Sequence, residues 1–163
     1  MQNITPFLWF EKNNAEEAIE YYVSVFPNSK ITHVERYPDG YTEGPLAGMA
    51  GKVLTGVFEL DGTKFMAIDG GPGVFSFSGA VSFVIECDTQ EQVDHYWSKL
   101  SAVSQAEQCG WCKDKFGITW QVTPKRLSQL LSDPDKAKAK RVMDVMMKMK
   151  KMDIAALEAA AQG

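Results

Sequence analysis

Histidine and cysteine are scarce in this sequence, which has two histidines and three cysteines among 163 residues. His33 and His95 fall in different predicted elements, so we expect surface or packing roles for them rather than metal ligation. Three cysteines are an odd number, which argues against a framework of disulfide bonds. The scarcity of both residue types leaves few donors for a metal or redox centre.

Long apolar runs are also missing. No stretch approaches the roughly 20 apolar residues that a membrane-spanning helix needs. The first residues, Met1-Gln2-Asn3-Ile4-Thr5-Pro6, lack the basic start and apolar core of a secretory signal peptide. We therefore expect a cytoplasmic protein with no membrane partner.

Positive charge is low overall but concentrated in one segment. The formal net charge is −4, which disfavours a nucleic-acid partner. Residues 125–151 contain nine Lys or Arg and three Asp or Glu, a local charge of +6, so the rest of the chain sums to −10. We interpret the basic segment as a solvated helical face in preference to an anion-binding patch.

The first half of the chain alternates between strand-like and helix-like patterns. Apolar residues recur at helical spacing over residues 15–26, and Asp61-Gly62 suits a tight hairpin turn because it tolerates positive φ. Residues 38–52 are rich in glycine and predict a loop. The predicted order is β, α, β, β, β, over residues 4–10, 15–26, 29–37, 53–60 and 64–68.

The second half repeats this order. We expect strands over residues 80–87, 105–112 and 118–123 and a helix over residues 89–102, with the second strand of this half the faintest signal. A short echo, residues 18–22 against 92–96 at an offset of 74, fits a duplication.

After Pro124 the pattern becomes purely helical. Asp133-Pro134-Asp135 separates a short helix from a longer one over residues 136–151, and an alanine-rich helix follows over residues 153–161. Five of the eight methionines lie in residues 143–152. The apolar stripe of this segment is expected to pack on the domain or on a partner subunit. The stripe comprises Val142, Val145, Met146 and Met149.

Several ordered strings carry a family resemblance that covers nearly the whole chain. They lie at residues 5–10 (TPFLWF), 26–29 (FPNS), 69–72 (DGGP), 109–114 (CGWCKD), 116–121 (FGITWQ) and 151–158 (KMDIAALE). In these strings the chain resembles the PhnB-like family of the glyoxalase/bleomycin resistance/dioxygenase (vicinal oxygen chelate) superfamily. This family is often labelled 3-demethylubiquinone-9 3-methyltransferase-like.

The resemblance implies an α+β fold of two βαβββ modules that form a glyoxalase-like cup, plus a C-terminal helical extension. The expected domain spans residues 1–125, with module one at 1–72 and module two at 78–125. The extension is expected at residues 126–163.

Metal-using relatives of this fold place His or Glu on the first and last strands of each module. The matched positions here are Thr5 or Phe7, Ala80 or Ser82, Met66 and Gln121. An amide and a thioether cannot replace two carboxylates around such a cation. We therefore expect no metal and no other cofactor.

Two further motifs carry possible chemistry. Residues 109–112 match the Cys-x-x-Cys spacing of redox pairs, but they fall in a predicted strand, so structural cysteines are favoured. Residues 66–73 (MAIDGGPG) resemble the strand and glycine loop of S-adenosylmethionine methyltransferases, which require a following helix. Residues 74–79 read as extended instead, so a linker between modules is favoured.

Strand alternation selects the residues of a candidate cavity with aromatic walls and a few hydroxyl and amide groups. Asp69 and Glu86 are the ionisable candidates near its rim. A pKa raised by burial could make either a general base, but exposed strand-end carboxylates are favoured. Catalytic residues are not assigned. The expected lining is Thr5, Phe7, Trp9, Met66, Asp69, Ser82, Val84, Glu86, Thr119 and Gln121.

The leading hypothesis is a metal-free protein that binds a small, partly apolar molecule and forms a homodimer. Whether it is an enzyme is left open. One alternative is an S-adenosylmethionine-dependent 3-demethylubiquinone-9 3-methyltransferase. The other is a metal-dependent lyase or dioxygenase.

Overall fold

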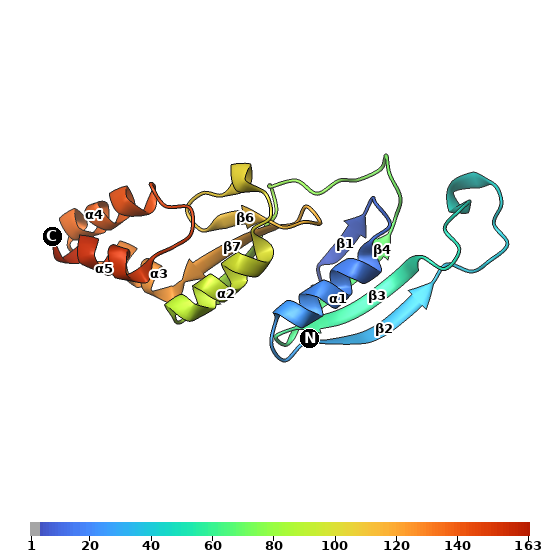
Figure 1. Cartoon of the computed structure of the whole chain (residues 1–163), viewed down its shortest axis with the longest axis horizontal. Helices are drawn as coiled ribbons and strands as arrows, with labels where there is room; N and C mark the ends of the chain where they lie inside the picture. The colour runs from blue at the N-terminus through green and yellow to red at the C-terminus, as the bar shows by residue number, and fades with distance from the viewer. Residues whose placement is uncertain (1–3) are drawn as a thin grey trace. The chain divides into compact units, whose positions relative to one another are not determined.

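The computed structural model describes residues 4–163, so the expectation that rests on Met1, Gln2 and Asn3 lies outside the described residues. The chain divides into two compact units, Met1–Phe77 and Ser78–Gly163, here called the first and second units (Figure 1). Within residues 4–163, no helix is long and apolar enough to cross a membrane.

The first unit forms a four-stranded sheet with one helix. Its strand order is β1-β4-β3-β2, with β1 parallel to β4 and the other neighbours antiparallel. The predicted order β, α, β, β, β is confirmed, and the long loop before β3 adds a 3₁₀ turn at Gly44–Leu46. The elements are β1 (Phe7–Phe10), α1 (Ala15–Val25), β2 (Lys30–Arg36), β3 (Val53–Leu60) and β4 (Thr63–Asp69).

Helix α1 covers one face of this sheet (Figure 1). It buries Ala18, Ile19 and Tyr22, three of the residues that the helical spacing of the sequence selected. A Cβ at Gly56 of β3 would lie 2.6 Å from Ile19 Cδ1, so this glycine permits close packing of helix on sheet. The hairpin at Asp61-Gly62 is confirmed, with both residues at positive φ.

One buried carboxylate joins three elements of the first unit. Asp69 is 2% exposed, and its Oδ1 accepts a hydrogen bond from Ala15 N at 2.8 Å, while its Oδ2 accepts one from Val53 N at 2.9 Å. Ala15 begins α1, whose own capping residue, Asn14, makes no side-chain cap. The end of β4 thus supplies the acceptor that the start of the helix lacks. The same charge, after burial, raises the pKa of Tyr37.

The second unit has a smaller sheet of order β5-β7-β6, in which β5 is parallel to β7 and β6 antiparallel. The predicted strand over residues 105–112 is wrong for most of its length. Residues Ser104–Ala106 form a 3₁₀ turn, and Cys109 and Gly110 both have positive φ, so the chain turns sharply before a short strand. The elements are β5 (Phe83–Cys87), α2 (Gln90–Leu100), β6 (Trp111–Lys113) and β7 (Thr119–Pro124).

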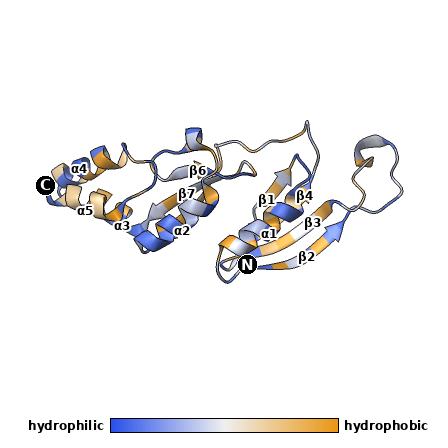
Figure 2. Ribbon diagram, in the orientation of Figure 1, coloured by the Kyte–Doolittle hydropathy of each residue, from blue (hydrophilic) through white to orange (hydrophobic). Residues whose placement is uncertain are grey.

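Three helices complete the second unit: α3 (Lys125–Leu131), α4 (Lys136–Met146) and α5 (Ile154–Gln162). Helix α4 ends at Met146 rather than continuing to residue 151 as predicted, because a turn begins at Met147. Val142 of the predicted stripe is fully buried, and the other three members are half-buried. Figure 2 shows α5 as largely apolar and α2 as largely hydrophilic.

The C-terminal segment is attached to the sheet by the turn at residues 109–110. Cys109 N donates to Met149 O and Gly110 N to Lys150 O, each at 2.8 Å. Met152 is fully buried, and its carbonyl accepts a hydrogen bond from Gln90 Nε2 at 3.1 Å. A Cβ on Gly110 would lie 2.8 Å from Val122 O, so the turn requires glycine.

Replacing Asp69 by alanine tests the buried junction. We expect Asp69→Ala to lower the free energy of unfolding by several kcal/mol, because each buried N–H left without a partner costs about 1–3 kcal/mol. Urea denaturation measures the loss, and Asp39→Ala, in the exposed loop before β3, is the control with an expected change below about 0.5 kcal/mol. Equal stability of the two variants would refute the junction.

Candidate functional site

Each sheet has one face turned away from the helix of its own unit, here called the open face. Alternation along the strands separates the two faces, since buried and partly exposed residues alternate in β3, β4 and β7. Nine of the ten predicted lining residues lie on the open faces or within two residues before their strands. In the first unit these are Thr5, Phe7, Trp9 and Met66.

A continuous row of side chains crosses the open face of the first unit. Phe7 pairs with Met66, Met66 with Val57, and Val57 with His33, so each of the four strands contributes one member. Phe7 is 51% exposed and Met66 is half-buried. The row therefore presents an apolar surface with an imidazole at one edge.

The glycine segment after β4 is hydrogen-bonded to other residues of the first unit. Gly70 N donates to Phe10 O at 3.2 Å and Gly71 N to Asn13 Oδ1 at 3.0 Å, while Trp9 Nε1 donates to Gly71 O at 3.2 Å. A Cβ at Gly70 would lie 2.0 Å from the Trp9 ring. Residues 70–82 form no helix, in agreement with the extended reading of this segment.

Asp69 is placed differently from expectation. It lies on the helix-covered side of the first sheet, where both carboxylate oxygens accept backbone N–H groups. It is therefore not an exposed strand-end carboxylate. Sequence reasoning missed this because strand position alone does not reveal which backbone groups a buried side chain will meet.

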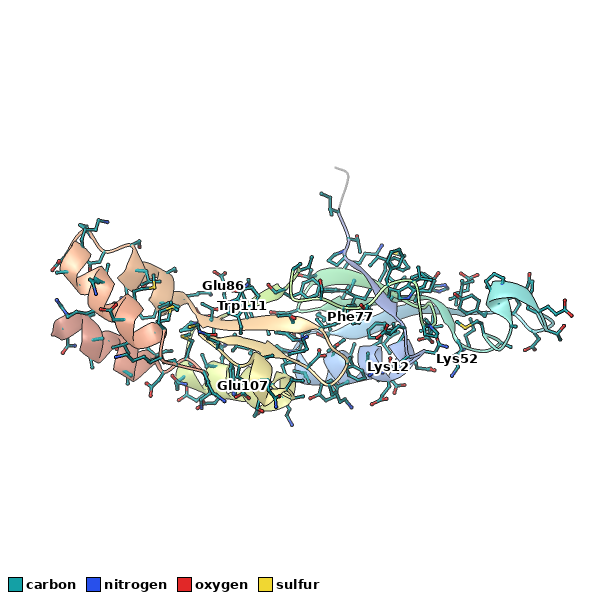
Figure 3. All side chains as sticks on the ribbon, turned by 90° about the horizontal axis from the view of Figure 1, so that it is seen from above. Lys12, Lys52, Phe77, Glu86, Glu107 and Trp111 are labelled. Carbon is teal, nitrogen blue, oxygen red and sulfur yellow. The ribbon has the colours of Figure 1, made fainter. Side chains whose placement is uncertain are left out.

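The open face of the second unit carries the remaining five predicted residues. Val84 pairs with Gln121 and Glu86 with Thr123, and Gln121 Nε2 donates to Ser82 Oγ at 2.9 Å. Figure 3 shows Glu86 on the opposite side of the second sheet from Glu107, which lies beside α2. The residues on this face are Ser82, Val84, Glu86, Thr119 and Gln121.

Two further residues of this face were missed from the sequence. Trp111 pairs with Gln121 and Lys113 with Thr119, so both point to the open face; Figure 3 shows Trp111 on the same side as Glu86. Placing the predicted strand at residues 105–112 hid this alternation. A strand predicted to begin after Gly110 would have placed the side chains of Trp111 and Lys113 on the open face.

The donor set at the matched metal positions does not fit a metal ion. Met66 offers a thioether and Gln121 a neutral amide, neither of which replaces a carboxylate around a hard or borderline cation. Within residues 4–163, no three His, Cys, Asp or Glu side chains form a group that could hold a metal.

The three cysteines differ in environment. Burial raises the pKa of Cys87 to about 11 and that of Cys112 to about 12. Cys109 is half-buried in the turn, and its Sγ lies 3.5 Å from Met146 O. The expectation of a strand for both members of the Cys-x-x-Cys pair is wrong for Cys109, which has a φ of 50°.

A second buried carboxylate organises the loop between β6 and β7. Asp114 is 1% exposed, and its Oδ1 accepts from Phe116 N at 2.9 Å and Ile118 N at 3.0 Å. Its Oδ2 accepts from Trp120 Nε1 at 2.7 Å. Asp114 and Trp120, which lie in the strings at residues 109–114 and 116–121, therefore have a structural role in this loop.

These units define an α+β protein of the class expected from the sequence, with two small sheets, a helix on each and C-terminal helices. The chain belongs to the family described as 3-demethylubiquinone-9 3-methyltransferase, whose model matches residues 2–123. A search of curated proteins found no match.

Two solved structures are similar. One is described as a putative 3-demethylubiquinone-9 3-methyltransferase, PhnB protein, from Bacillus cereus; it is 36% identical, with a TM-score of 0.64, over 76% of this chain and 99% of that chain. The other is protein PA1353 from Pseudomonas aeruginosa, 18% identical, with a TM-score of 0.58, over 76% of this chain and 98% of that chain. The second shows likeness of fold alone.

Thiol labelling tests the environments of the cysteines. At pH 8 we expect iodoacetamide to modify Cys109 while Cys87 and Cys112 stay unmodified in the folded protein, because raised pKa values leave little thiolate. Peptide mass spectrometry locates the label. Cys109→Ser should abolish modification of the folded protein. In a urea-unfolded sample of the parent protein, all three cysteines should be modified. Rapid labelling of Cys112 in the native protein would contradict the assignment.

Proposed function

We propose that this protein binds a small, partly apolar molecule on the open face of a sheet. The observation that carries the proposal is the exposure of large apolar side chains on strands beside hydroxyl and amide groups. Phe7 is 51% exposed, Val84 57% and Trp111 38%. Such side chains at regular strand positions favour an interaction surface, since apolar groups in contact with a few oriented polar groups are typical of ligand sites.

Methyl transfer from S-adenosylmethionine is the alternative that the family description suggests. Binding of that cofactor by a glycine segment relies on backbone N–H groups that face the ligand. Here the N–H groups of Gly70 and Gly71 are used by Phe10 O and Asn13 Oδ1. This engagement favours a structural segment over a cofactor loop.

A metal-dependent lyase or dioxygenase is the other alternative. Such an enzyme would need a set of carboxylates or imidazoles on the strands as metal ligands. The matched positions offer Met66 and Gln121 instead, so a metal-free site is the better proposal. We also propose that the chain forms a homodimer, because Met143 and Met147 of the C-terminal region remain exposed beside the buried Val142.

Native mass spectrometry of the freshly purified protein tests the binding proposal. We expect a bound small molecule, seen as a mass increment on gentle ionisation and lost on denaturation. Val84→Lys and Trp111→Lys should each weaken its retention, because a charge on the apolar face of the second unit opposes burial by a ligand. The same spectrum reports whether the chain is a dimer.

Tyr41→Lys is the matched control, since it adds the same charge at an exposed apolar residue in the loop before β3, outside the open faces. It should leave the increment unchanged. An increment that survives both open-face substitutions would place the ligand elsewhere. No increment in the parent protein, even after incubation with a metabolite extract, would overturn the proposal.

A further inference from the structure

One end of the open face of the second unit carries a row of polar side chains. Thr119 on β7 pairs with Lys113 on β6, so the two side chains point to the same face. Ser82 directly precedes β5, and its Oγ accepts from Gln121 Nε2 at 2.9 Å, which leaves the Ser82 proton available for donation. We call Ser82, Lys113 and Thr119 the polar row.

The Thr119 hydroxyl lacks a hydrogen-bond partner. Thr119 is 8% exposed, and its Oγ1 is buried with no partner among the described residues. Burial of a hydroxyl without a partner is unfavourable, and most buried side-chain polar atoms have at least one partner. A local cost of this kind is expected at a functional position, where a ligand supplies the missing partner.

Lys113 adds an uncompensated positive charge to the polar row. It is half-buried and forms no ion pair with any residue in 4–163. The exposed carboxylate of this face, Glu86, is level with Thr123. Thr123 is four residues along β7 from Thr119, or about 13 Å at the rise of a strand. Glu86 is therefore too far along the face to pair with Lys113.

Apolar side chains form the next row of the face. Val84 and Trp111 flank Gln121 on its two sides in the sheet. The two rows are separated by two residues of β7, about 7 Å. A molecule with an acceptor group at one end and an apolar group a short distance away would contact both rows.

We infer that the polar row binds the carboxylate of a small molecule whose apolar part packs on Val84 and Trp111. A carboxylate accepts hydrogen bonds without donating, and thus complements two hydroxyl donors and an ammonium. A neutral carbonyl would satisfy a hydroxyl but leave the Lys113 charge uncompensated. This inference rests on the proposed function and specifies its ligand class.

Titration of the ¹⁵N-labelled protein with 3-phenylpropionate and with its neutral amide tests the inference by NMR. We expect saturable shifts of the Ser82, Lys113 and Thr119 amides, and at least about tenfold tighter binding of the acid than of the amide, the effect of a charge-assisted contact. Lys113→Met should remove most of this preference. Lys115→Met, which removes the same charge at an exposed position two residues away, should not.

Thr119→Val separates a binding role from a structural one. It keeps the β-branched shape but removes the unpartnered hydroxyl, so the melting temperature should stay equal or rise while acid binding weakens about tenfold. A lower melting temperature with unchanged binding would overturn the role of Thr119. Equal binding of acid and amide would overturn the carboxylate site and leave the proposed surface standing. No shifts from either compound on the open faces would overturn both.

Discussion

Two backbone N–H groups that no regular element could satisfy depend on the carboxylate of Asp69. One begins α1 and the other begins β3, and the carboxylate lies at the end of β4. Because these groups are buried, an apolar residue at position 69 would leave both without partners. The junction fixes the helix over one face of the first sheet and thereby defines which face stays open.

Strings that carry the family resemblance serve structure at several points of both units. Gly70 and Gly71 bind the segment after β4 to the loop before α1, and Asp114 holds the loop before β7. The turn at Cys109 and Gly110 holds the C-terminal segment. Several residues of these strings are therefore explained by their role in the scaffold. The proposed binding depends on further side chains of the same strings, such as Lys113, which forms no ion pair with the described residues.

The sequence predicted the elements whose signals are local. Helical spacing located α1, and the Asp61-Gly62 turn located the β3–β4 hairpin. Features that depend on distant partners were not accessible. The buried role of Asp69 requires knowledge of Ala15 and Val53, and the end of α4 at Met146 reflects attachment of the following residues to the turn at 109–110. Alternation placed nine of the ten candidate residues on or beside the open faces because it needs only the strand.

Calorimetric titration with S-adenosylmethionine tests most directly whether the glycine segment is structural. Since Gly70 N and Gly71 N already have acceptors within the first unit, we predict no saturable heat at micromolar to millimolar cofactor. Saturable micromolar binding that Gly71→Val abolishes would contradict this account and make methyl transfer the leading function.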